Sequence, residues 1–147
     1  MKTLYMSRPL ENGEEFSEWA KSQGFKSILG NDDFHVTIAF SREEIDWDKI
    51  TPNTNTMTVE GGKREVSPLG SEGAVVLKFK SEFLPKRWKE LKDLGASWDY
   101  EGYQPHVTIT YKGTDTDLND VEPYNGKLVF GHEQMSKLDL DWMDDKN

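Results

Sequence analysis

The sequence predicts an α+β domain made of two similar β-α-β-β lobes around a pseudo-twofold cleft, and three observations support this. Segments 34–40 and 105–111 share the core His-Val-Thr-Ile. They lie 71 residues apart, about half of the 147-residue chain. Gly24 and Gly95, which suit the ends of helices, each precede the histidine of their half by 11 residues. The short motif does not require this second spacing, so the chain is interpreted as a duplication.

Each half is predicted to begin with a strand that is followed by a helix. The strands are expected over residues 3–7 and 74–78, which are rich in β-branched and other apolar residues. The helices are expected over residues 14–23 and 85–94, where apolar side chains recur at helical spacing and form one face. The His-Val-Thr-Ile segments then supply the next strand of each half.

Each half is predicted to continue with a polar loop and a short strand. Residues 41–55 and 112–126 are rich in proline, asparagine and aspartate, which favour loops. Residues 57–59 and 128–130 follow as strands, and each is expected to begin a hairpin or meander. Gly61-Gly62 is the expected turn of the first.

The two halves are expected to form a single domain over residues 1–147. Lobe one covers about residues 1–70 and lobe two about 71–147. A lobe of about 70 residues is too small to bury both its helix face and its sheet. The two lobes are therefore expected to pack together, with a cleft between their equivalent central strands.

Composition excludes several classes of function. Asp and Glu outnumber Lys and Arg by 27 to 18, and the net charge of −9 disfavours duplex nucleic acid and anionic membranes as partners. The absence of cysteine excludes disulfides, thiolate metal sites and a cysteine nucleophile. The sequence contains neither a secretory signal nor an apolar stretch long enough to span a membrane, so an intracellular protein is expected.

The repeated His-x-Thr motif predicts a phosphodiester-cleaving site. Residues two apart in a strand face the same side, so His35 lies beside Thr37 and His106 beside Thr108. One imidazole can accept a proton from an attacking oxygen while the other protonates the leaving oxygen. The threonine hydroxyls can bind the phosphate oxygens. This chemistry requires no metal and no cofactor, and the symmetry leaves open which histidine is the base.

These residues also allow other interpretations. A single His-x-Thr is more often a packing or surface feature, but two copies at repeat positions use two of the three histidines and favour catalysis. A zinc site would need a carboxylate ligand in addition to the two histidines. Tyr103 lies in the aromatic segment before His106 and is expected to bind substrate by stacking on a base, with packing in the second lobe as the alternative.

The paired motifs resemble the 2H phosphoesterase superfamily, whose members have a LigT-like fold. Residues 5–9, 19–25 and 98–106 are similar to phage anti-CBASS nucleases, which degrade the cyclic oligonucleotide messengers of bacterial antiphage defence. The superfamily implies that the two histidines and two threonines of the motifs are catalytic. The resemblance also implies nucleobase contacts from three further residues, namely Tyr5, Glu133 and Trp142.

The expected function is that of a metal-independent phosphodiesterase. It would hydrolyse 3′–5′ bonds of cyclic di- or oligonucleotides such as cyclic GMP–AMP in the cytoplasm of an infected or lysogenic bacterial host. Two alternatives remain open: a 2′,3′-cyclic phosphodiesterase acting on RNA ends or small nucleotides, and a binding protein that sequesters cyclic nucleotides. The sequence does not predict an oligomeric state.

Overall fold

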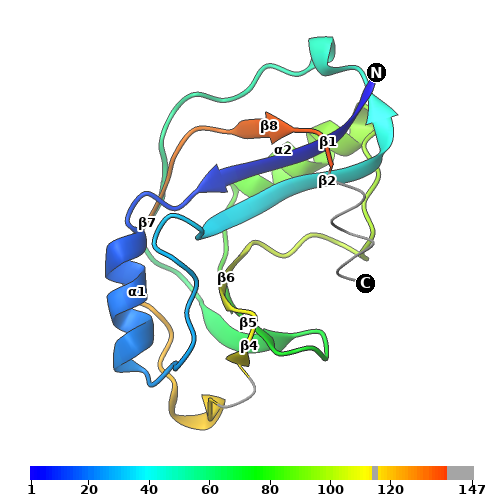
Figure 1. Ribbon diagram of the computed structural model, residues 1–147. Coiled ribbons are helices and arrows are strands. Elements are labelled where there is room, and N and C mark those ends of the chain that lie inside the picture. Colours follow the sequence, from blue (N-terminus) through cyan, green and yellow to red (C-terminus); the bar gives the residue numbers. More distant parts are fainter. Residues whose placement is uncertain (114–115, 139–147) are drawn as a thin grey trace.

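The computed structural model describes residues 1–113 and 116–138, and its main sheet has six antiparallel strands in the order β4-β5-β6-β2-β1-β8 (Figure 1). The helices and strands are β1 (Lys2–Pro9), α1 (Gly13–Ser22), β2 (His35–Ile45), β3 (Met57–Val59), β4 (Glu65–Leu69), β5 (Ala74–Lys78), α2 (Phe83–Asp93), β6 (His106–Thr110), β7 (Leu128–Phe130) and β8 (Gln134–Ser136). Short 3₁₀ helices occupy Trp47–Lys49 and Leu118–Asp120. The predicted α+β class is confirmed.

The duplication is visible in the order of the elements. The series β1, α1, β2, β3 in the first half corresponds to β5, α2, β6, β7 in the second. The halves meet where β2 pairs with β6, and Val36 lies opposite Val107 at that junction. The two His-x-Thr segments are therefore the central strands of the sheet.

The halves also exchange their last strands. β4 pairs with β5 of the second half, and β8 returns to pair with β1 of the first. β3 pairs with β7 and does not turn back on itself, so the hairpin expected at Gly61-Gly62 is wrong. After β3 the chain does not fold back on this strand. The guanidinium of Arg64 donates hydrogen bonds to the backbone carbonyls of Tyr124 and Gly126 and so ties the segment after β3 to the other half.

Both predicted helices end where the glycine spacing indicated. α1 has its C-cap at Gln23 and α2 at Leu94, and the next residues, Gly24 and Gly95, have positive φ angles of 94° and 110°. A residue without a Cβ adopts this left-handed conformation without strain. The first loop is shorter than predicted, because β2 continues to Ile45.

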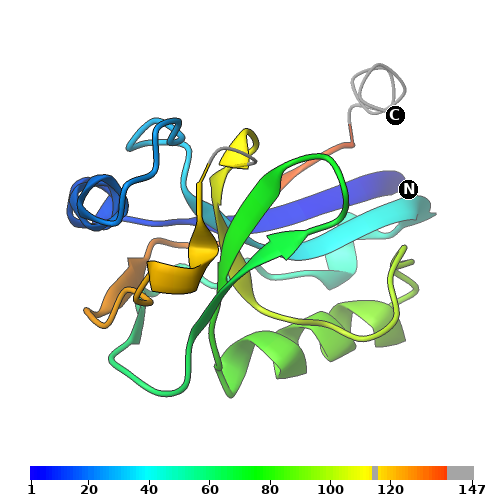
Figure 2. The same ribbon diagram turned by 90° about the horizontal axis from the view of Figure 1, so that it is seen from below.

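The core lies between the sheet and its helices. Val36 and Val107 are fully buried, so the intervening residue of each His-x-Thr motif packs inward. α1 buries Phe16 and Ala20, while α2 packs against β2. Figure 2 shows α2 below the strands and α1 beside them. None of the helices within the described ranges is long and apolar enough to cross a membrane.

Candidate active site

The two His-x-Thr pairs lie on the two central strands. Extending the antiparallel register by one residue on either side of Val36 and Val107 places His35 across from Thr108 and Thr37 across from His106. All four side chains are partly exposed, on the face opposite the buried valines. The fold thus brings together the four predicted catalytic residues from two segments that are distant in the sequence.

Backbone carbonyls fix both imidazoles in the same way. Nδ1 of His35 lies 2.8 Å from the carbonyl oxygen of Asp33, and Nδ1 of His106 lies 2.9 Å from that of Gln104. A carbonyl oxygen only accepts, so each Nδ1 carries the hydrogen and donates it. In the neutral rings, Nε2 is therefore left with its lone pair. Each histidine can accept or return a proton at Nε2, as general acid–base chemistry requires.

The environment of His106 favours its neutral form. Burial lowers the pKa of this imidazole below its ordinary value, and the charges of His35 and Lys78 lower it further, against the opposing bond to Gln104. Lys78 lies directly across from His106 in the pairing of β5 with β6. A neutral imidazole at neutral pH is suited to accept a proton.

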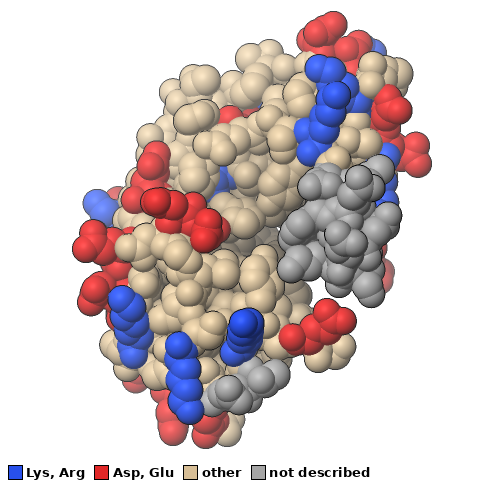
Figure 3. All heavy atoms as spheres, viewed as in Figure 1, with Lys and Arg blue, Asp and Glu red and all other residues tan. Residues whose placement is uncertain are grey.

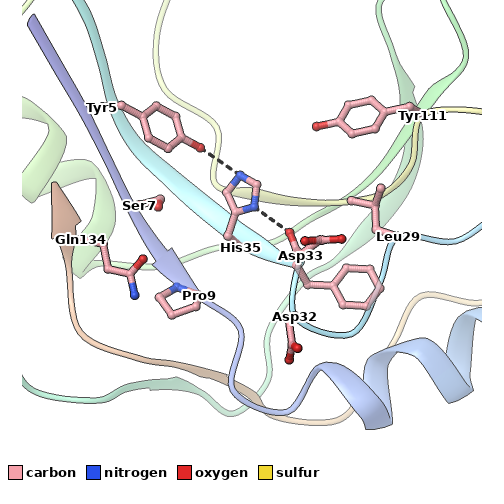
Figure 4. Close-up of a pocket in the computed structure, with 10 residues that line it drawn as sticks. Tyr5, Ser7, Pro9, Leu29, Asp32, Asp33, His35, Tyr111 and Gln134 are labelled. Atoms are coloured by element: carbon pink, nitrogen blue, oxygen red, sulfur yellow. Dashed lines mark hydrogen bonds between the residues drawn. The ribbon is translucent and has the colours of Figure 1, made fainter. Parts of the chain in front are cut away.

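Tyr5 makes the two histidines different. Its hydroxyl lies 3.0 Å from Nε2 of His35 (Figure 4) and 3.0 Å from Oγ1 of Thr37. Burial raises the pKa of Tyr5, so the phenol stays protonated at neutral pH and acts only through hydrogen bonds. The residue 71 positions later is Val76, which is buried and has no polar group. Tyr5 was predicted to contact a nucleobase, and the structure places it directly on the His35 side of the site.

A pocket of about 420 Å³ opens beside His35. Its ten lining residues are Tyr5, Ser7, Pro9, Leu29, Asp32, Asp33, Phe34, His35, Tyr111 and Gln134 (Figure 4). The volume is in the range of small-molecule sites. The lining combines aromatic rings with carboxylate, amide and hydroxyl groups, which can contact both faces and edges of a nucleotide base.

Tyr111, Ser7 and Gln134 are among the pocket residues that sequence reasoning missed. Tyr111 is 57% exposed, and its ring points toward Tyr5 across the opening (Figure 4). The repeat contains an aromatic residue three positions after each threonine, which is the signal that could have identified Tyr111. Ser7 and Gln134 are brought together only by the pairing of β1 with β8, for which the sequence has no motif.

Tyr103 lies behind the site, in contact with other aromatic rings. Its hydroxyl donates to the carbonyl oxygen of Thr37 at 2.6 Å, and its ring stacks on Trp88 with centroids 5.6 Å apart. Trp98 packs on both rings. This placement differs from the expected contact with a base, because the face and hydroxyl of Tyr103 are already used to support the strand that carries Thr37.

Glu133 also lies elsewhere than expected. Its side chain has no exposed surface, and its carboxylate accepts hydrogen bonds from Arg87 at 2.9 and 3.0 Å and from the backbone N–H of Asn53 at 2.8 Å. The guanidinium of Arg8, which is 1% exposed, lies 4.0 Å away. The expected base contact is thus corrected to a buried ion-pair cluster that holds the β8 segment. Trp142, the third expected base contact, lies outside the described residues.

The surface around the site carries charges of both signs. Figure 3 shows a centre formed mainly by uncharged residues, with acidic and basic side chains around it on several sides. Asp32 and Asp33 line the pocket itself. In residues 1–113 and 116–138 no group of three or more histidine, aspartate or glutamate side chains is arranged to hold a metal ion.

Comparison with known proteins gives one consistent family. The family model of the anti-CBASS protein Acb1 matches residues 2–145. An Acb1 protein of Caulobacter sp. (strain RHG1) is 51% identical over 99% of this chain, which spans only 24% of that relative's length. An Acb1 protein of Vibrio phage KVP40 is 32% identical, with 88% of this chain and 82% of the relative covered.

A solved structure shows the same fold. The crystal structure of E. coli LigT complexed with 3′-AMP superposes with a TM-score of 0.62 at 14% identity, covering 91% of this chain and 86% of that one. The predicted LigT-like fold of the 2H phosphoesterases is confirmed. With the family match over nearly the whole length, the chain belongs to the Acb1 family of anti-CBASS proteins.

Proposed function

We propose that this protein is a phosphodiesterase that cleaves 3′–5′ bonds of cyclic di- or oligonucleotide messengers and thereby counteracts CBASS antiphage defence. The observation that carries the proposal is the pair of imidazoles on β2 and β6, each held at Nδ1 by a backbone carbonyl so that Nε2 is the atom left for proton transfer. Membership of the Acb1 family supports the same activity. The cytoplasm of an infected or lysogenic bacterial host is the proposed place of action, in keeping with relatives that are encoded by phages.

The proposed mechanism uses only the residues of this chain. One histidine removes the proton of a ribose 2′-hydroxyl, whose oxygen attacks the adjacent phosphorus, and the other protonates the departing 5′-oxygen. Thr37 and Thr108 hydrogen-bond the non-bridging oxygens and stabilise charge that develops on them. Water then opens the resulting 2′,3′-cyclic phosphate with the proton roles reversed.

The proposed substrate enters by the pocket beside His35. Tyr5 and Tyr111 present aromatic rings at its opening, and such rings stack on bases of any sequence. The carboxylates of Asp32 and Asp33 repel additional phosphates but accept hydrogen bonds from base edges. A small cyclic nucleotide, with few phosphates, fits this lining better than a long polyanion does.

The test is product analysis in excess EDTA. Purified protein is mixed in parallel with 3′,3′-cyclic GMP–AMP and with a linear oligonucleotide ending in a 2′,3′-cyclic phosphate, and products are identified by chromatography and mass. Ring opening of the cyclic dinucleotide supports the proposal. Turnover of the linear substrate alone assigns the protein to RNA-end processing, and saturable binding without product identifies a sequestering protein; either outcome contradicts the proposal.

A further inference from the structure

One polar residue from each strand of the main sheet lies in a single row across the sheet. The row is centred where β6 meets β2, because His106 lies across from Thr37 at this junction. On the other side of His106, directly across from it on β5, lies Lys78. In strand order from β4 to β8, the row contains Glu65, Lys78, His106, Thr37, Ser7 and Gln134. Lys78 is the cation of this row and the neighbour of a predicted catalytic histidine.

Lys78 and His106 project from the same face of the sheet. Directly opposite residues of an antiparallel pair point to the same side, with Cβ atoms about 4.5–5.5 Å apart. Leu77, the residue before Lys78, is fully buried in the core, so the alternation along β5 places Lys78 on the opposite face. Burial is the main cause that lowers the pKa of His106, and the charges of His35 and Lys78 lower it further. The ammonium group of Lys78 therefore lies within electrostatic reach of the site.

Lys78 differs from the other basic residues of the main sheet in its lack of a partner. The strands of this sheet contain four basic residues, namely Lys2, Arg8, Arg42 and Lys78. The first three have partners, which are the ring of Trp47 and the carboxylates of Glu133 and Asp99, respectively. Within residues 1–113 and 116–138, Lys78 forms no ion pair, although the exposed Glu65 lies across from it on β4. A partly buried ammonium group beside His106 is thus available to an anion.

The phosphate in the proposed reaction requires a cation of this kind. Negative charge on the non-bridging oxygens increases as the 2′-oxygen attacks, and donors aimed at these oxygens stabilise it. The hydroxyls of Thr37 and Thr108 are neutral donors, and the carboxylates of Asp32 and Asp33 in the pocket disfavour added negative charge. Neighbouring strands lie about 4.8 Å apart. The long, flexible side chain of Lys78 can therefore reach a phosphate held between β2 and β6.

We propose that Lys78 is a further catalytic residue, whose ammonium group binds a non-bridging oxygen of the cleaved phosphate and stabilises the charge that develops there. This inference rests on the proposed function. Lys78 forms no covalent bond and transfers no proton, since the two histidines move both protons of each step. The residue 71 positions earlier is Ser7, so the repeat has this cation in its second half and a neutral hydroxyl in its first.

Three variants test the role of the charge. Lys78→Met removes the ammonium group, whereas Lys78→Arg keeps a positive charge. Lys80→Met is the matched control, because it makes the same change at an exposed position two residues later. The kcat and KM for 3′,3′-cyclic GMP–AMP are measured in EDTA at the pH optimum of each variant, so that a shift in the pKa of His106 does not contribute. Urea unfolding shows whether each variant is folded.

The expected loss lies in kcat. Lys78→Met should lose about 10²-fold, as expected when a donor to a developing oxyanion is removed. The KM should change much less than kcat, because the contact strengthens as charge develops. Lys78→Arg should recover most of the activity, and Lys80→Met should match the wild type.

Sulfur substitution identifies the oxygen that the ammonium group binds. Four analogues of cyclic GMP–AMP each carry one sulfur, at either non-bridging position of the cleaved phosphate or of the other phosphate. Sulfur is a weak hydrogen-bond acceptor. At one position of the cleaved phosphate, the wild type and Lys80→Met should lose about tenfold through the weakened contact with Lys78. Lys78→Met should lose little from the same sulfur. Each ratio compares two substrates on one variant, so a partly unfolded sample does not change it.

Three results would overturn the inference and leave the proposed function intact. Activity of Lys78→Met close to that of the wild type would show that Lys78 acts only on the pKa of His106. Equal losses in Lys78→Met and Lys78→Arg would show that the charge is unimportant. A sulfur effect that persists in Lys78→Met, or that disappears only at the other phosphate, would place the ammonium group away from the cleaved phosphate. If the wild type does not cleave cyclic GMP–AMP at all, the proposed function fails and the inference fails with it.

Discussion

The two halves of the molecule present the same motif in different settings. In both, a histidine is clamped at Nδ1 by the carbonyl of the residue two positions earlier, and a threonine follows on the same face. In the described residues, a tyrosine hydroxyl contacts Nε2 of His35, and the pocket of about 420 Å³ opens beside this histidine, with Tyr111 and Gln134 of the second half in its lining. Duplication thus supplies two histidines in equivalent positions, while divergence around them gives His35 a tyrosine partner and a neighbouring pocket.

The exchanged strands differ in a similar way. The segment leading to β4 is held by Arg64, which donates to backbone carbonyls of the other half. The segment leading to β8 is held by the buried carboxylate of Glu133 between Arg8 and Arg87. The position equivalent to Glu133 in the first half is Gly62, which has no side chain. The segments leading to β4 and to β8 are both anchored by charged side chains, but of these two only the segment leading to β8 buries an ion pair.

The largest expected effect is the loss of activity when the histidine of either half is removed. His35→Ala and His106→Ala should each lower kcat for the cyclic dinucleotide by about 10²–10⁴-fold, since each removes one proton-transfer group. The measurement is steady-state turnover in EDTA. Near-normal turnover in either variant would mean that a single half is sufficient, and would contradict the two-histidine mechanism.

The next effect tests the anchoring of β8. Glu133→Gln keeps the shape of the side chain but leaves buried guanidinium charge unpaired, so the free energy of unfolding should fall by about 3–5 kcal/mol. Glu90→Gln is the control, because Glu90 also pairs with Arg87 but its side chain is 63% exposed. That change should cost no more than about 1 kcal/mol. Equal losses in urea unfolding would show that burial of the carboxylate is unimportant.

The next prediction compares the contributions of Thr37 and Thr108 to phosphate binding and turnover. Thr37→Val and Thr108→Val each remove one donor to a phosphate oxygen, so a loss in kcat of about 10²-fold is expected for each. The loss in Thr37→Val should be the greater, because Thr37 also holds the hydroxyl of Tyr5. A greater loss in Thr108→Val, measured on the same substrate, would contradict the asymmetry.

The smallest expected effect is a shift in the pH dependence of kcat/KM. If His106 is the base, its lowered pKa should place the acid limb of the kcat/KM profile at a lower pH than an ordinary imidazole would give. Lys78→Met removes a cation that disfavours the imidazolium, so the pKa of His106 rises and the acid limb of the profile should move to higher pH. Lys80→Met, at an exposed neighbouring position, should leave the limb in place. A limb that is unmoved in Lys78→Met would show that this residue does not act on the base.

Much of this organisation was predictable from spacing alone. The repeat at 71 residues located both helices, the central strands and the four motif residues, because period-two alternation and helix-ending glycines are local properties. The strand exchange was not predictable, since β8 is only three residues long and the partners of β4 and β8 are chosen by tertiary packing. For the same reason the Ser7–Gln134 contact and the burial of Glu133 became visible only in the fold.

The most direct test of the central claim is the crystal structure of His106→Ala bound to uncleaved 3′,3′-cyclic GMP–AMP. We expect one phosphate between β2 and β6, within hydrogen-bond distance of Nε2 of His35 and of the hydroxyls of Thr37 and Thr108, with a base in the pocket beside Tyr5. A phosphate bound away from the junction of the two central strands would contradict the claim that the halves act together on one phosphodiester bond.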